Sequence, residues 1–128
     1  MERINPEGIH KPGTAYSHIV KAGKTLYIAG QIALDPAGNI VGVGNAAAQA
    51  RQVYENLKAC LASQGLGMDR VVKITTYVTS RDYLDAVRDQ RSSYFPLGSA
   101  PASTLLVVAG LARPELLIEI DAIAVLPG

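Results

Sequence analysis

Short stretches in which apolar and polar residues alternate predict most of a β-sheet. Residues 71–79 show this most clearly, because the even positions from Val72 to Val78 form one stripe and more polar side chains form the other. The predicted strands are residues 17–20, 25–31, 71–79, 104–109 and 116–126. The link Ala22-Gly23-Lys24 joins the first two strands and predicts a hairpin.

Two other segments repeat apolar residues every three or four positions, which predicts helices. The first begins after Asn45, a favourable N-cap, and stops at Gly65. The second spans residues 81–95 and is ended by Pro96. The first 13 residues contain two prolines and two glycines and are predicted to form an irregular arm.

This order of elements predicts one α+β domain over residues 1–128, with two helices covering one face of a mixed sheet. The opposite face would carry Tyr27, Ala29 and Gln31 from one strand, and Thr75 and Tyr77 from another. Such a face is half apolar, and burial against another copy of the chain would explain it. We therefore expect a homo-oligomer with clefts between its subunits.

Composition and charge narrow the classes of function. The chain has 128 residues and no apolar run near the roughly 20 residues of a membrane span, and its start lacks the layout of a signal peptide. We therefore expect a cytoplasmic protein with no membrane partner. The net charge is +1 and no basic stripe is present, so we expect no nucleic-acid partner.

Few residues are suited to metal or nucleophilic chemistry. Cys60 is the only cysteine, and His10 and His18 are the only histidines. Neither histidine is spaced with cysteines or carboxylates as metal ligands are. We predict no metal and no cofactor, and a nucleophilic triad is not supported.

Paired carboxylates are the strongest candidate chemistry. Glu119 and Asp121 are two residues apart in a predicted strand, so they share a face about 6 to 7 Å apart. Burial and mutual repulsion would raise at least one pKa, which suits a group that activates water. The alternative is a solvated strand face.

Tyr16 could gate a pocket or pack the arm down, and Arg88 could reach an interface or lie in solvent.

Several motifs together resemble one known family. They are AGQI at 29–32, AQARQ at 48–52, VKITTYV at 72–78, PA at 101–102 and IEIDAIA at 118–124. With them the chain resembles the RidA/YjgF family of reactive intermediate deaminases along nearly its whole length. The resemblance implies a chorismate-mutase-like fold, a cytosolic homotrimer, and ligand sites in the clefts between subunits. Its best-known members are hydrolases that convert enamines and imines to a keto acid and ammonia without a cofactor.

The resemblance also implies roles for individual residues. Glu119 stands where the family keeps the glutamate that positions water, and Tyr16 where it has a tyrosine near the pocket mouth. Gly30, followed by Gln31, matches the turn S-G-Q, whose serine is Ala29 here.

The family's deaminases read P-A-R-S-C at the strand that begins near residue 101, and their arginine clamps the substrate carboxylate. Here Ser103 replaces that arginine and Leu105 replaces the cysteine. A hydroxyl offers one donor and no charge, so it cannot replace a guanidinium. Our hypothesis is that Arg88, on the second helix, binds the substrate anion in place of the family's arginine. This would leave space above Ser103 for a different substrate.

The resulting interpretation is a deaminase-like hydrolase acting on small enamines, imines or related unsaturated amino acids. Glu119 would be the catalytic residue, and Tyr16, Ala29, Gly30, Arg88, Ser103 and Leu105 would line the substrate site. Two alternatives remain: a non-enzymatic trimer that binds or senses a small ligand, and an endoribonuclease or translation inhibitor.

Overall fold

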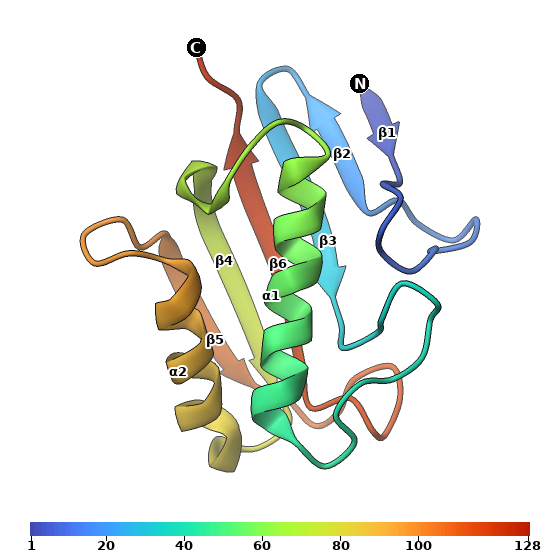
Figure 1. Ribbon diagram of the computed structural model, residues 1–128, viewed down its shortest axis with the longest axis vertical. Helices are drawn as coiled ribbons and strands as arrows, with labels where there is room; N and C mark the ends of the chain where they lie inside the picture. Colours follow the sequence, from blue (N-terminus) through green and yellow to red (C-terminus); the bar gives the residue numbers. More distant parts are fainter.

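The alternating stretches form one six-stranded sheet in the computed structural model, which describes residues 1–128 (Figure 1). The sheet order is β1-β2-β3-β6-β4-β5, and only β4 and β5 pair in parallel. This is the mixed sheet that the sequence predicts. The strands are β1 Glu2–Ile4, β2 Ile19–Ala22, β3 Thr25–Gln31, β4 Val71–Val78, β5 Ala102–Val107 and β6 Ile118–Val125.

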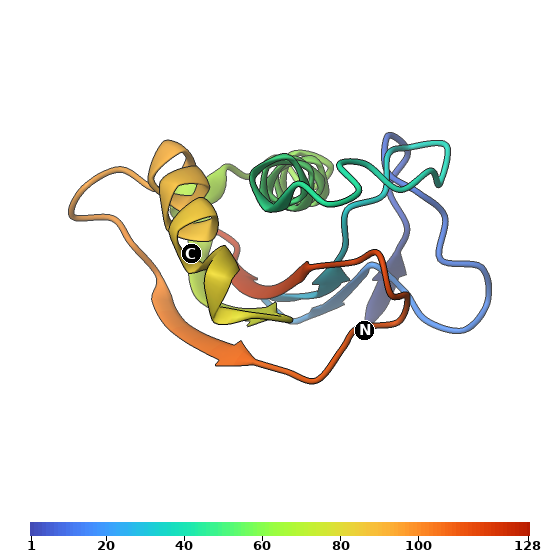
Figure 2. The same ribbon diagram turned by 90° about the horizontal axis from the view of Figure 1, so that it is seen from below.

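The two helices, α1 (Ala46–Ala62) and α2 (Leu84–Tyr94), lie on the same face of the sheet, as predicted (Figure 2). Asn45 caps α1, because its side chain accepts a hydrogen bond from the backbone N–H of Ala48. A single 3-10 turn, η2 (Arg81–Tyr83), precedes α2, and another, η1 (Met68–Arg70), precedes β4. Neither α-helix combines the length and apolar character that a bilayer crossing requires.

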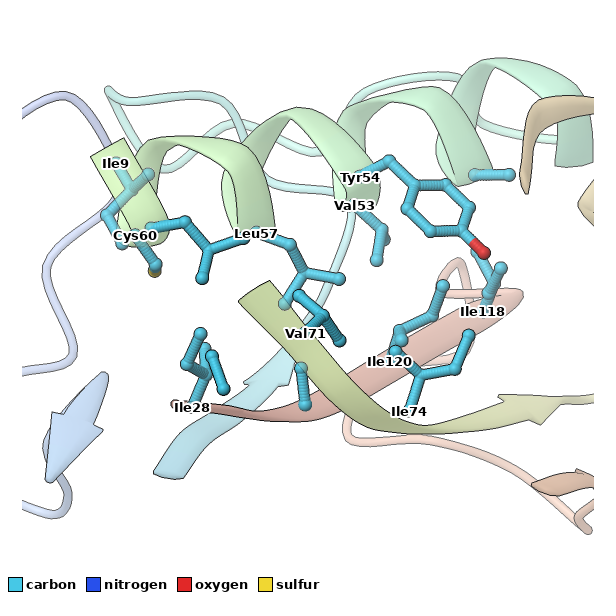
Figure 3. Packing of buried hydrophobic residues seen from close by; sticks show 14 of the residues in the cluster. Ile9, Ile28, Val53, Tyr54, Leu57, Cys60, Val71, Ile74, Ile118 and Ile120 are labelled. Carbon is cyan, nitrogen blue, oxygen red and sulfur yellow. The ribbon is translucent and has the colours of Figure 1, made fainter. Parts of the chain in front are cut away.

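The hydrophobic core lies between the helices and the sheet. From β6, Ile118, Ile120, Ala122 and Ala124 are all buried, whereas the residues between them are only partly buried. Figure 3 shows Val53 and Leu57 of α1 pointing toward these strands. The period-two pattern of the last strand therefore sets which of its residues face solvent on the helix-free side.

The ends of several predicted elements differ from the structure. Residues 2–4 are not irregular, because β1 pairs with β2 through Arg3 and Val20. The first hairpin turns through Gly23 and Lys24 alone, since Ala22 already pairs with Thr25. The strand predicted over residues 104–109 is β5, which spans Ala102–Val107 in the structure. These segments lie at or near an edge of the sheet, where pairing with a neighbour outweighs local pattern.

Two irregularities move side chains to the other face. The β3–β6 register shifts between Ile28 and Gln31, and the β4–β6 register shifts between Val71 and Lys73. The prediction that Gln31 lies on the helix-free face is therefore wrong, because Gln31 is fully buried. In the same way Val72 is exposed although the alternation placed it with the core. An extra residue in one strand reverses the alternation beyond it.

Candidate functional site

Glu119 lies on β6 on the helix-free face of the sheet, as its alternation predicts. Its partner across the strand pair is Tyr77 of β4, and Asp121 follows two residues later on the same face. The Tyr77 hydroxyl donates a hydrogen bond to Oδ2 of Asp121, at 3.2 Å. The Glu119 side chain makes no hydrogen bond to another protein group, so its carboxyl group is free to bind water or a ligand.

Gly30 provides the space that Glu119 occupies. A Cβ added to Gly30 would press on Oε2 of Glu119 and would lie 2.8 Å from its Cδ. This close approach follows from the register shift between Ile28 and Gln31, which turns Gly30 to the face of the sheet that carries Glu119. Gly30 does not have a positive φ, so the glycine is required here for close approach and not for backbone conformation.

The surroundings of Glu119 change how it binds a proton. Burial raises the pKa of Glu119, and the nearby charge of Asp121 raises it further. The pKa of Tyr16 is also raised, first by burial and second by the charge of Glu119. We call Tyr16, Gly30 and Glu119 the glutamate half-site. All three are among the site residues predicted from the sequence, and their role at a site stays a prediction.

An open groove of about 400 Å³ lies beside the glutamate half-site. Its lining includes Ala29 and Gly30 from β3 and Asp121 and Ile123 from β6. Tyr27, which is half exposed, also lines the groove. The groove gives a small ligand access to the strand that carries Glu119.

A buried histidine supports this part of the sheet, and the sequence reasoning did not identify it. His18 Nε2 donates to the backbone carbonyl of His10 at 2.6 Å, and Nδ1 accepts from Gln31 at 3.1 Å. The Gln31 amide also donates to the carbonyl of Ala29. The His18 ring meets that of Tyr16 edge-on, with centroids 5.7 Å apart. At the level of sequence we considered His18 only as a metal ligand, and the one local signal is its place in a predicted strand next to the buried Ile19.

The remaining predicted site residues lie elsewhere in the chain, and we call Arg88, Ser103 and Leu105 the arginine half-site. Ser103 pairs with Ile74 and Leu105 with Thr76, so both face the helix side of the sheet. Arg88 is exposed on α2 and has no ion-pair partner. Figure 2 shows α2 on the same side of the sheet and above its β4–β5 end.

One copy of the chain does not bring the two half-sites together. Glu119 and Ser103 lie on opposite faces, and β4 separates β6 from β5. No group of three or more His, Cys, Asp or Glu side chains is placed to hold a metal ion. The chemistry available within one chain is therefore that of a single carboxyl group with a raised pKa beside an open groove.

Comparisons with known proteins match the chain over its full length. The family model described as endoribonuclease L-PSP matches residues 8–126. A RutC family protein of Synechocystis is 41% identical, with 99% of this chain and 98% of the relative covered. The 3-aminoacrylate deaminase RutC of Acinetobacter baylyi is 36% identical, with 96% of each chain covered.

Among solved structures, the YjgF gene product of E. coli superimposes with a TM-score of 0.88 at 31% identity. The alignment covers 98% of each chain. The resemblance seen in the sequence motifs is thus confirmed. This chain belongs to the endoribonuclease L-PSP family, the family of RutC, RidA and YjgF proteins.

Proposed function

We propose that the protein is a hydrolytic deaminase acting on small enamines or imines derived from amino acids. The observation that carries this proposal is the Glu119 carboxyl group, which has a raised pKa and no hydrogen bond to the protein. The carboxyl group occupies the space that a side chain at position 30 would fill. A relative that is 36% identical and bears the name 3-aminoacrylate deaminase supports the reaction class.

The proposed reaction needs only water and proton transfer. The Glu119 carboxylate accepts a proton from water while the water oxygen bonds to the imine carbon, and the C=N π electrons move to nitrogen. Protonation of that nitrogen gives a carbinolamine. Loss of ammonia then forms the carbonyl group, so that imine and water become keto acid and ammonia. An enamine first becomes the imine by gaining a proton at carbon and losing one from nitrogen. No cofactor takes part in these steps.

We further propose that the site is completed between copies in a homotrimer. The arginine half-site at the β5 edge of one copy would lie opposite the glutamate half-site on the open face of its neighbour. Exposed Tyr27 and Leu106 on that face support burial against another copy. Arg88 would then bind the substrate carboxylate, because Ser103 carries no charge.

The test is a coupled assay in which imines are generated in situ from several amino acids. We expect the protein to accelerate their hydrolysis over buffer, and Glu119→Gln to lower the rate roughly hundredfold or more, as for loss of a general base. Thermal unfolding of the variant would confirm an intact fold. Hydrolysis no faster than in buffer with every imine would contradict the proposal and would favour a ligand-binding trimer.

The role of Arg88 is tested in the same assay. Arg88→Ala is expected to raise KM roughly tenfold or more, because a charge-assisted contact to the carboxylate is lost. Arg81→Ala is the matched control, since Arg81 is another exposed arginine just before the same helix. Equal KM values for wild type and Arg88→Ala would remove Arg88 from the site.

A further inference from the structure

A second hollow lies apart from the candidate active site, at the end of the sheet where β3 ends and β6 begins. It measures about 420 Å³ and shares no lining residue with the groove beside Glu119. Three separate segments form it: the N-terminal arm, the turn after β3, and the loop before β6. Its lining residues are His10, Lys11, Leu34, Pro36, Ala37, Gly38 and Arg113.

Two cations line this hollow without a partner. The chain contains one ion pair, between Lys21 and Glu2, so Lys11 and Arg113 are both unpaired. Neither side chain donates a hydrogen bond to a protein group. The nearest acid in the turn, Asp35, uses Oδ1 to accept from the backbone N–H groups of Ala37 and Asn39. The positive charge of the hollow is therefore not neutralised from within the chain.

A buried histidine adds an unmet donor. His10 is only 5% exposed, and neither of its ring nitrogens has a hydrogen-bond partner. Burial lowers its pKa, followed by the charges of His18 and Arg113, so the ring is neutral at pH 7 and carries one N–H donor. A buried polar group without a partner is unusual in proteins and points to a bound molecule.

We propose that this hollow binds a doubly charged oxyanion, the phosphate group of a small metabolite. Arg113 presents a planar fork of donors that suits phosphate oxygens, Lys11 adds a point charge, and the His10 ring adds a neutral N–H. The volume exceeds that of a phosphate ion, so a small organic group fits beside it. This site is independent of the proposed deaminase activity.

Nuclear magnetic resonance of the two histidine rings tests the proposal, with inorganic phosphate as the probe. We expect a saturable change in the His10 ring signals and a higher pKa for His10 with phosphate bound, because the anion stabilises the imidazolium. Acetate, with a single charge, should bind more weakly. His10 signals that do not saturate, or that respond equally to acetate and phosphate, would overturn the proposal.

Substitutions test which residues of the hollow bind phosphate. Arg113→Gln is expected to weaken phosphate binding roughly tenfold or more, since a charge-assisted contact is lost. Lys58→Gln, which removes an exposed cation from α1, is the matched control and should leave binding unchanged. Arg88→Ala should also leave it unchanged. If Arg88→Ala abolished phosphate binding while Arg113→Gln did not, the anion would belong to the arginine half-site and the proposal would fail.

Discussion

Two effects raise the pKa of Glu119. Partial burial disfavours the charged carboxylate, and the charge of Asp121 disfavours it again. Tyr77 donates to Asp121 rather than to Glu119, so the hydroxyl stabilises the neighbour and leaves the candidate base free. The pair thus gives one carboxyl group a raised pKa and the other a hydrogen-bond partner, a division suited to a single general base.

Removing the charge of Asp121 should therefore move the pH dependence of the reaction. Asp121→Asn keeps the shape of the side chain and an acceptor for Tyr77, but lowers the pKa of Glu119. Because the base acts when ionised, kcat/KM rises with pH through that pKa, and the rising limb should shift to lower pH in the variant. A pH–rate profile measures the shift. An unmoved limb, or one at higher pH, would show that Glu119 is not the titrating base.

The sequence predicted the face of Glu119 and Asp121 because residues two apart in a regular strand share a side. It did not predict the role of His18, whose two ring hydrogen bonds join residues 10 and 31. Such contacts depend on how distant segments meet. The same holds for His10, Lys11 and Arg113, since no local pattern relates the arm to the loop before β6.

At the scale of elements, the irregular end of β3 decides the site. Strict alternation places Gln31 on the open face and Gly30 toward the helices. The register shift reverses this, burying Gln31 beside His18 and turning Gly30 to Glu119. A glycine inside a predicted strand is the one local sign of such a bulge. Its consequence for the side-chain faces became visible only from the pairing with β6.

This geometry predicts a specific effect for Gly30→Ala. The added methyl group would displace the Glu119 carboxyl group, so we expect a loss of kcat of roughly tenfold or more, because small displacements of a catalytic group are costly. The assay described above measures it. Gly110→Ala is the matched control, since nothing lies within 4 Å of its added Cβ. Equal activity of both variants would mean that Glu119 does not act from this position.

Helix ends were easier to predict than strand ends. Asn45 and Gly65 mark α1 through local capping and turn geometry, and both features are present in the structure. The limits of β1 and β5 depend instead on neighbouring strands, because these are the two edges of the sheet. Local sequence therefore predicted the limits of α1 better than those of β5, the edge strand that carries Ser103.

At the scale of the whole molecule, one chain holds two half-sites that do not meet. Glu119 opens to the helix-free face, whereas Ser103 and Leu105 face the helix side at the β5 edge. Tyr27 and Leu106 leave apolar surface exposed on the open face. Association of copies would bury that surface and could join unlike half-sites, which links the proposed oligomer directly to the proposed chemistry.

Complementation between two impaired variants tests this link. Glu119→Gln and Arg88→Ala copies carrying different tags are coexpressed and purified through both tags, so that every trimer contains both. If each site joins the glutamate half-site of one copy to the arginine half-site of the next, one site in each mixed ring is intact. The mixed trimer should then recover about a third of the wild-type kcat/KM, well above either parent. Homotrimers of each variant, mixed after purification without subunit exchange, are the control. Activity of the mixed trimer no higher than the mean of its parents would show that Arg88 and Glu119 do not share a site between copies.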